Sequence, residues 1–434
     1  MKKSLLFVLS LIVVMAMVLT ACATPAAEET EETMVEEAEE VVEEEVAAES
    51  PGLQMEAAEV AAQFFSMDDY DQSLAWMANE PVNPDDPIYL QYLLEDPTSI
   101  ADYPQYEQKD GPYNICFSNA GVNNPWRVVG YTTMGEQVLQ LQDEGVIGNF
   151  YHVDAQGSDE KQIADIEDLI SNPDQCDLLI VSPNTSEALT PVIEQACEVM
   201  PVVMFDRYAL TDCPVVSERP IGGYAFGISG AQFIVDTLGE EGGNVLAIRI
   251  LPGVDVLEQR WGAAKVIFEE NPQLNIIGVE FSAYDSFEVN TIVQDYLARF
   301  GEIDAVWMDA GGTAVSILEA FEDAGIDYPK AMVGEDQNDY LAFWSEKGLN
   351  AIAPTFPTYQ WRTAILASVM FLQGETVQHN WVLPQIPVTS DNLADYYNPD
   401  MPPLHYAQCG CEDMVNYPDA WINVDVAKYD NLNE

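Results

Sequence analysis

Short apolar runs alternate with amphipathic segments between Tyr113 and Gly334. Runs that are apolar along their whole length are typical of strands buried on both faces of a parallel sheet. A first series of such strands is predicted at 113–118, 149–153, 177–182 and 202–205. A second series is predicted at 244–250, 275–281, 304–308 and 331–334. Between the strands, apolar residues recur at helical spacing, as in Tyr131, Met134, Val138 and Leu141.

A glycine-rich stretch at 219–227 separates the two series. Eight strands are many for one sheet, so we predict an α/β protein with two doubly wound parallel-sheet lobes. A single barrel is the structural alternative. Residues 53–111 precede the repeat and lack its pattern. We expect them to form a helical and loop extension packed on one lobe.

The N-terminus has the pattern of an export signal. Lys2 and Lys3 precede an apolar run at 5–18 and the sequence LTAC at 19–22. The run is shorter than the about 20 residues that a membrane-spanning helix needs. LTAC resembles a lipobox, so we predict a lipoprotein signal peptide at 1–21 and lipidation of Cys22.

Residues 22–52 contain twelve Glu and no basic residue, which predicts an acidic, disordered tether. The whole chain has a net charge of −59, and without the signal lysines and these Glu it still has about −49. Such a surface repels nucleic acid and anionic lipid, so neither is an expected partner.

Six cysteines remain besides Cys22, and in an exported protein they can pair in 15 ways. We expect some disulfide bonding but assign no pair. Cys116 lies within a predicted strand, where a small buried hydrophobic residue is expected. Cys409 and Cys411 lie in a loop in which we identify no nearby histidine ligand, which argues against zinc. No metal, cofactor or catalytic residue is predicted.

Polar side chains gather directly after the strands, where open parallel sheets bind ligands. These stretches are 119–127, 182–186, 206–207, 251–262, 282–286, 309–312 and 335–339. Arg207 is conspicuous there, because the chain has only 15 Lys and Arg. Carboxylates accept hydrogen bonds from hydroxyl groups, Arg donates them and Asn does both. Aromatic rings such as Trp126 and Tyr284 can pack against the C–H faces of a sugar ring. The set predicts a site for a neutral sugar or polyol.

Several of these residues have a structural alternative. Asp206 and Asp336 could be turn residues, and Arg260 could pair with Glu258 or Glu269 on its own helix. Trp307 lies within a strand and is expected in the core.

At these residues the chain resembles the ribose/galactose-type periplasmic sugar-binding proteins, the type I receptors of ABC importers. The resemblance covers about 113–384 and is carried by NNPW at 123–126, by 154–170 and by 176–207, which ends in FDR; PGVDVLEQR at 252–260 also points to the site. It implies sugar contacts by Asn124, Trp126, Asp206, Arg207, Arg260, Tyr284 and Asp336. Ser182 stands where ribose binders have Asn. Asp309 and Phe356 mark departures from the ribose pattern, and together with Ser182 they complete the predicted ligand-binding residues. A pocket for a sugar other than ribose is therefore expected.

The resemblance implies two lobes joined by a three-segment hinge. The first lobe would comprise 112–221 and 356–383, with a helix at 361–371. The second would comprise 222–355, together with the tail, 384–434. Hinge closure on a mono- or small oligosaccharide would present a monomeric, lipid-anchored receptor on the outer side of the membrane to a permease.

Three other functions are alternatives to that of an import receptor. An exported carbohydrate-active enzyme is disfavoured, because common hydrolase motifs are missing and the chain has only three histidines. A sugar-responsive repressor would need a basic DNA-binding segment, where this chain has a signal and Glu. A receptor that feeds chemotaxis or a sensor kinase stays open, since the residues do not separate it from an import receptor.

Overall fold

The computed structural model describes residues 55–432 of the chain. The predicted signal peptide, Cys22 and the predicted tether, 22–52, lie outside the described residues, as do the first two residues of the extension, 53 and 54. Among the helices of 55–432, none combines the length and the apolar character needed to cross a bilayer.

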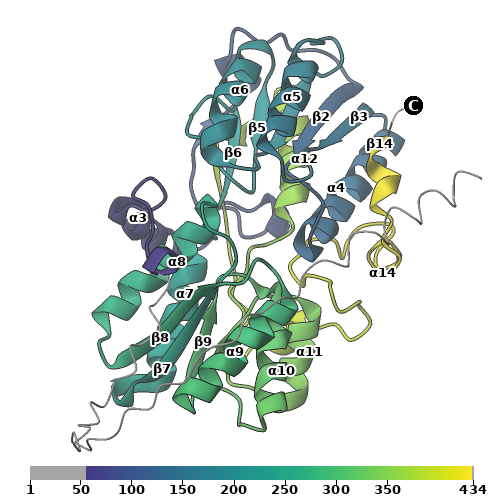
Figure 1. Ribbon diagram of the computed structural model, residues 1–434. Coiled ribbons are helices and arrows are strands. Elements are labelled where there is room, and N and C mark those ends of the chain that lie inside the picture. The colour runs from purple at the N-terminus through teal and green to yellow at the C-terminus, as the bar shows by residue number, and fades with distance from the viewer. Residues whose placement is uncertain (1–54, 433–434) are drawn as a thin grey trace, which may run out of the picture. The chain divides into compact units, whose positions relative to one another are not determined.

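The first lobe contains a seven-stranded sheet within the described residues (Figure 1). Its order is β13 (Asn380–Leu383), β6 (Val216–Pro220), β5 (Val202–Met204), β4 (Leu178–Ser182), β2 (Tyr113–Asn119), β3 (Ile147–Asp154) and β14 (Asn431–Leu432). Neighbouring strands run parallel, except that β14 is antiparallel to β3.

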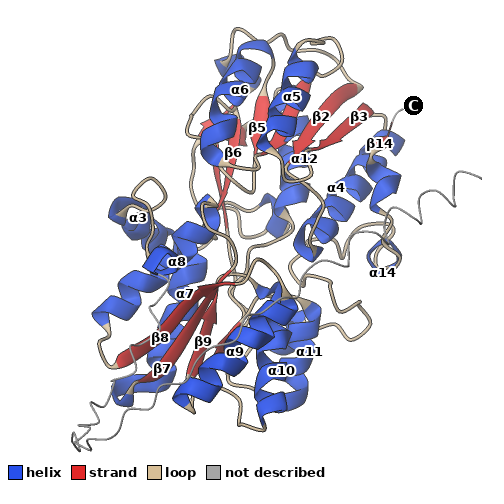
Figure 2. Ribbon diagram, in the orientation of Figure 1, coloured by secondary structure: helices blue, strands red, loops and turns tan. Residues whose placement is uncertain are grey.

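Helices cover both faces of this sheet (Figure 2). They are α4 (Pro125–Asp143), α5 (Asp159–Ile170), α6 (Ser186–Val199) and α12 (Gln360–Leu372). Alternate side chains of β2 point to opposite faces: Phe117 packs in the core with α4 and α12, while Cys116 packs in the core with α5 and α6. The predicted helix at 361–371 is confirmed as α12. It crosses α4 at Gly130, where an added Cβ would lie 2.2 Å from the ring of Trp361.

The second lobe repeats this plan with a five-stranded parallel sheet. Its order is β11 (Ala351–Ile352), β10 (Ala331–Val333), β9 (Ala305–Met308), β7 (Gly243–Arg249) and β8 (Leu274–Phe281). The helices are α7 (Tyr224–Leu238), α8 (Asp255–Glu270), α9 (Ser286–Phe300), α10 (Ala314–Ala324) and α11 (Asn338–Lys347). Two open sheets exclude the barrel alternative. Trp307 is fully buried in β9, as expected of a core residue.

The chain crosses between the lobes three times, near 221–223, 353–359 and 384–388. The extension contains α2 (Met55–Ala58), α3 (Met67–Met77), η1 (Ile88–Leu90), β1 (Pro97–Thr98) and η2 (Ile100–Asp102), and β1 pairs with β12 (Val377–Gln378). The expectation that it packs on one lobe is wrong. Arg249 of β7 donates to the carbonyl of Ala57 at 2.6 Å, whereas Leu93 donates to the carbonyl of Val382 in β13 at 2.8 Å.

The C-terminal tail also contacts both lobes, which corrects its assignment to the second lobe alone. It contains α13 (Leu393–Tyr396), α14 (Asp419–Ile422), η5 (Val426–Tyr429) and β14. The carbonyl of His405 accepts a hydrogen bond from the backbone of Asn338 in the second lobe. The end of the tail joins the first lobe, because Tyr429 packs on Gly135 of α4 and donates to Glu136 at 2.7 Å.

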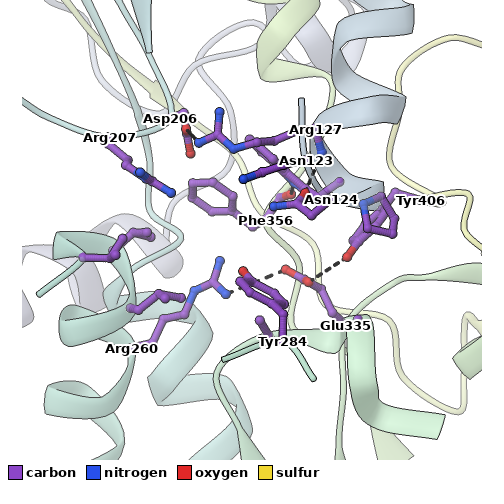
Figure 3. Close-up of a pocket in the computed structure, with 17 residues that line it drawn as sticks. Asn123, Asn124, Arg127, Asp206, Arg207, Arg260, Tyr284, Glu335, Phe356 and Tyr406 are labelled. Carbon is purple, nitrogen blue, oxygen red and sulfur yellow. Dashed lines mark hydrogen bonds and ion pairs between the residues drawn. The ribbon is translucent and has the colours of Figure 1, made fainter. Parts of the chain in front are cut away.

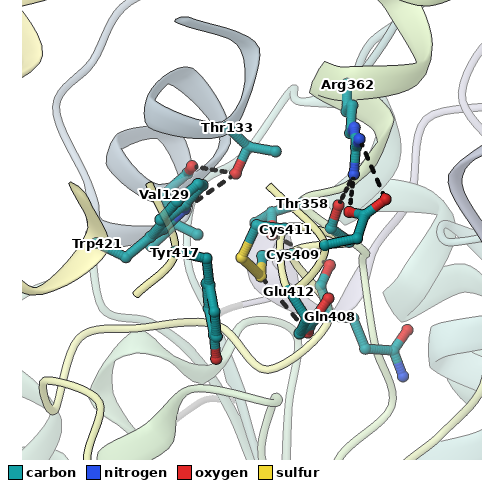
Figure 4. The surroundings of a disulfide bond; sticks show 12 residues. Val129, Thr133, Thr358, Arg362, Gln408, Cys409, Cys411, Glu412, Tyr417 and Trp421 are labelled. Atoms are coloured by element: carbon teal, nitrogen blue, oxygen red, sulfur yellow. Dashed lines mark hydrogen bonds and ion pairs between the residues drawn. A yellow bond between two sulfur atoms is a disulfide. The ribbon is translucent and has the colours of Figure 1, made fainter. Parts of the chain in front are cut away.

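Three disulfide bonds join Cys116 to Cys176, Cys197 to Cys213, and Cys409 to Cys411. Cys116 is buried, as expected, but it is not a free thiol, because Cys176 lies two residues before the neighbouring strand β4 and the two Cα atoms are 5.6 Å apart. The Cys409–Cys411 bond lies in the tail beside Tyr417 and Glu412 (Figure 4). His405 does lie near it: one ligand atom of each of these three residues falls within 4.8 Å of the others. Both sulfur atoms are nevertheless bonded to each other.

Candidate functional site

The strand ends of the two lobes meet around a cavity of about 190 Å³ (Figure 3). One side comes from the loop before α4 and from the turn after β5, and the other from the ends of β7, β8, β9 and β10. The lining residues are Asn123, Asn124, Pro125, Trp126, Arg127, Asp206, Arg207, Val254, Val256, Leu257, Arg260, Tyr284, Ala310, Gly312, Glu335, Phe356 and Tyr406. The cavity thus lies at the carboxyl ends of both sheets, where parallel α/β sheets bind ligands.

A buried ion pair forms the wall on the first-lobe side. Nη2 of Arg127 lies 2.5 Å from Oδ2 of Asp206, and the two side chains are 3% and 4% exposed. Ser182 donates to the same carboxylate oxygen at 2.8 Å. Burial lowers the pKa of Arg127, and Asp206 opposes that shift. Ser182 itself is fully buried and does not line the cavity, so it orients Asp206 from behind.

Arg207 extends into the cavity from the same turn and is partly buried. Its Nη1 donates to the carbonyl of Asn184. Its buried Nε has no hydrogen-bond partner among the described residues, which leaves a donor for a ligand. Asp206 has a φ of 70°, a left-handed conformation that costs free energy in residues other than glycine. Such strain, held by the ion pair, is typical of functional turns.

Arg260 of α8 faces Arg207 from the second lobe (Figure 3). It donates to the carbonyls of Gly222 and Asp309, and its Nη1 lies 3.8 Å from Oε1 of Glu335. The alternative pairing with Glu258 or Glu269 is wrong. Glu258 pairs with Arg249 at 2.7 Å and Glu269 with Lys265 at 3.9 Å.

Glu335, rather than the predicted Asp336, presents its carboxylate to the cavity. Both residues follow the end of β10 at Val333, and the two side chains have different surroundings: Glu335 lines the cavity and Asp336 does not. Oδ2 of Asp336 instead accepts a hydrogen bond from the backbone of Gln408 in the tail at 2.8 Å. Burial raises the pKa of Asp336 to about 7, and it also raises the pKa of Glu335.

Asp309 also does not line the cavity, although it was predicted to contact sugar. It is fully buried at the end of β9, and its carbonyl accepts from Arg260. Burial raises the pKa of Asp309 to about 7, against the opposing effect of Arg249 and Arg260. Its backbone carbonyl thus helps to hold the guanidinium of Arg260 in place, whereas both oxygens of its carboxylate have no hydrogen-bond partner among the described residues.

Four aromatic rings line the cavity: Trp126, Tyr284, Phe356 and, from the tail, Tyr406. The rings of Trp126 and Phe356 lie 5.3 Å apart between their centroids, and Trp126 Nε1 donates to the carbonyl of Phe356 at 2.6 Å. Phe356 belongs to a crossing segment between the lobes. Tyr284 has a φ of 62° in the loop after β8. Asn124 caps α4, since its Oδ1 accepts a hydrogen bond from the backbone N–H of Arg127 at 2.9 Å, and it also lines the cavity.

Of the predicted site residues, the structure gathers Asn124, Trp126, Asp206, Arg207, Arg260, Tyr284 and Phe356 around the cavity. The sequence interpretation missed Asn123, Arg127, Glu335 and Tyr406. Arg127 directly follows the NNPW motif, and its scarcity as a basic residue was a usable signal. Tyr406 could not have been found, because it comes from the tail, 50 residues after Phe356; its hydroxyl donates to Glu335 Oε2 at 3.2 Å.

The cavity therefore combines three guanidinium groups, two carboxylates, two amides and three aromatic faces besides Tyr406. Donors and acceptors are both plentiful and the charges nearly balance. A neutral ligand with many hydroxyl groups matches this arrangement best.

Comparison with known proteins agrees with this fold. The family described as periplasmic binding protein domain matches residues 115–376. The ribose import binding protein of Bacillus subtilis (strain 168) is 30% identical over 271 residues, which cover 61% of this chain and 84% of that protein. The D-allose-binding periplasmic protein of Escherichia coli (strain K12) is 29% identical over 112 residues, which cover 26% and 36%.

Among solved structures, an ABC transporter solute binding protein from Thermobispora bispora DSM 43833 superposes with a TM-score of 0.61. It is 23% identical and the match covers 70% of this chain and 95% of that chain. At that identity the superposition shows the fold alone. The family match and the Bacillus relative go further: this chain belongs to the periplasmic binding protein family.

Proposed function

We propose that this chain is an extracytoplasmic sugar-binding protein that captures its ligand by closure of the two lobes and delivers it to the membrane subunits of an ABC importer. The observation that carries the proposal is the cavity itself, in which Arg207 and Asp206 of one lobe face Arg260 and Glu335 of the other. A ligand that bonds to both sets stabilises the closed form more than the open one.

The chemistry of the cavity supports a monosaccharide-sized ligand. Its volume of about 190 Å³ is below the roughly 300–1,000 Å³ of pockets for drug-sized molecules. The relatives named for their ligands bind ribose and D-allose, and a Bacillus halodurans C-125 solute binding protein of the same fold has bound myo-inositol. All three are neutral polyhydroxylated compounds, and this class fits the balanced charges of the present cavity.

The contacts of Asp206 support binding rather than hydrolysis. Its carboxylate is held in place by Arg127 at 2.5 Å and by Ser182 at 2.8 Å, which suits a fixed hydrogen-bond acceptor for a ligand hydroxyl group. We further propose that the predicted lipid on Cys22 and the acidic tether keep the receptor close to its permease, which raises its local concentration there.

Thermal-shift screening of the purified chain against mono- and disaccharides tests this function. A ligand that binds only the folded form at 100 times its Kd stabilises it by about 2.7 kcal/mol. We expect one group of stereochemically related sugars to raise Tm in a concentration-dependent way and to bind with 1:1 stoichiometry in calorimetry. No shift with any sugar, or release of product from a glycoside, contradicts the proposal.

A further inference from the structure

A second and larger cavity, of about 770 Å³, lies beside the candidate sugar cavity. The two share Asn123, Asn124 and Pro125 as lining residues. The opposite wall of the second cavity comes from the tail, at 402–405 and 421–424, and the next tail residue, Tyr406, lines the first cavity. The same two segments, 123–125 and 402–406, therefore border both cavities. We call the second one the tail groove.

The tail groove is apolar and carries no formal charge. Among the residues that the structure describes, no Asp, Glu, Lys or Arg lines it. Burial lowers the pKa of His405 to about 4, so that this side chain is neutral at pH 7. Leu404, Ile422 and Val424 are 54%, 42% and 39% exposed. The chain has a net charge of −59, so its surface is otherwise strongly polar. An exposed apolar surface in such a setting is typical of a binding site for an apolar group.

The tail wall of the groove lies outside the residues matched by the family, 115–376. It is nevertheless held firmly. Trp421 donates a hydrogen bond to the hydroxyl of Thr133 in α4 at 3.1 Å (Figure 4). Asn338 of α11 donates a hydrogen bond to the carbonyl of Met401 at 3.0 Å. The groove is thus a formed surface of this chain rather than a gap beside a loose segment, and a formed surface loses less entropy when it binds.

We propose that the ligand is a glycoside, with its sugar ring in the candidate sugar cavity and an apolar aglycone in the tail groove. This inference rests on the proposed function and specifies its ligand. A second sugar would need donors and acceptors along the groove, but its polar lining is confined to Asn123, Asn124 and His405. An apolar ring or chain would bury Leu404, Ile422 and Val424 and gain the free energy of that burial.

Calorimetry with the full chain and matched pairs of methyl and phenyl glycosides tests the inference. Each pair has the same sugar and the same anomeric configuration, so that only the aglycone differs. We expect the phenyl glycoside to bind at least about tenfold more tightly, a difference of about 1.4 kcal/mol. The double variant Leu404→Ser, Val424→Ser should reduce this preference to less than about twofold while methyl glycoside affinity stays unchanged. Val415→Ser is the matched control, since Val415 is a tail residue, 85% exposed, that does not line the groove.

The outcomes separate the two proposals. Equal affinity for both members of a pair, binding of free sugars but of no glycoside, or a phenyl preference that survives the double variant each overturn the inference and leave sugar binding intact. Failure of every sugar and glycoside to bind contradicts the proposed function and this inference with it.

Discussion

Arg127 and Asp206 form a buried ion pair that joins the start of α4 to the turn after β5, with Nη2 and Oδ2 2.5 Å apart. The pair fixes two loops that are 79 residues apart in sequence, and both side chains line the candidate sugar cavity. A buried pair adds little net stability when intact, but the loss of one partner leaves an uncompensated charge. Loss of either partner is therefore expected to change both the stability of the first lobe and the shape of the cavity.

Asp206→Ala should lower the free energy of unfolding by about 3–5 kcal/mol, because Arg127 would stay buried without its counter-charge. Urea denaturation at pH 7 measures the change. Asp295→Ala is the matched control: it removes the exposed partner of Arg299, at 2.9 Å, and should cost less than about 1 kcal/mol. A loss at Asp206 as small as that at Asp295 would show that Arg127 does not depend on this partner.

Arg207→Ala should weaken sugar affinity at least about 100-fold, because a guanidinium that donates two charge-assisted hydrogen bonds contributes about 1.5–3 kcal/mol for each. The circular dichroism spectrum should stay unchanged, since Arg207 is only partly buried. Calorimetry with the sugar found by screening measures the effect, with Arg299→Ala on the surface of α9 as control. Unchanged affinity would remove Arg207 from the site.

Tyr406→Phe should weaken sugar affinity about tenfold, because Glu335 loses the hydroxyl that orients its carboxylate at 3.2 Å. The ring of Tyr406 stays in place, so the unfolding midpoint should change little. Tyr417→Phe tests a tail tyrosine whose hydroxyl contacts Asn398 at 3.5 Å, away from the cavity lining. Equal effects of the two variants would mean that the tail does not contribute specifically to the site.

Asp336→Asn should make the protein more stable than wild type at pH 8 but not at pH 4. Burial raises the pKa of Asp336 to about 7 in the folded state, so the stability linked to its protonated form is complete below about pH 4 and is lost as the pH rises through 7. The Asn side chain can still accept the hydrogen bond from the backbone N–H of Gln408, and it does not ionise. The difference in unfolding free energy should therefore grow with pH, by at most about 4 kcal/mol. Parallel pH profiles would contradict the burial argument.

The sequence predicts β2–β5 and β7–β10 well, because strands buried on both faces are apolar along their whole length and stand out as runs. It does not predict the outer strands β6, β11, β13 and β14. The end of the apolar run also shows that Asp206 and Arg207 follow a strand directly. Since parallel sheets bind ligands beyond the carboxyl ends of their strands, this position is enough to predict that both residues lie at the site. The choice between Glu335 and Asp336 depends on the exact residue at which β10 ends, which an apolar run does not define.

Long-range contacts account for the remaining differences between the predicted and the observed structure. Tyr406 reaches the cavity because the tail pairs with Gln337, and β14 joins β3 because Tyr429 fits against Gly135. Neither contact leaves a periodic signal in the sequence. The pairing of Cys116 with Cys176 likewise depends on which strands are neighbours in the sheet, and the runs do not give the order of the strands.

A crystal structure of the protein with the sugar identified by screening tests the central claim most directly. The account predicts electron density for the sugar ring between the lobes, with hydroxyl groups within hydrogen-bonding distance of Asp206, Arg207 and Arg260 and with a ring face against Trp126 or Phe356. Density for the sugar on an outer surface of either lobe, with this cavity filled only by water, would contradict it.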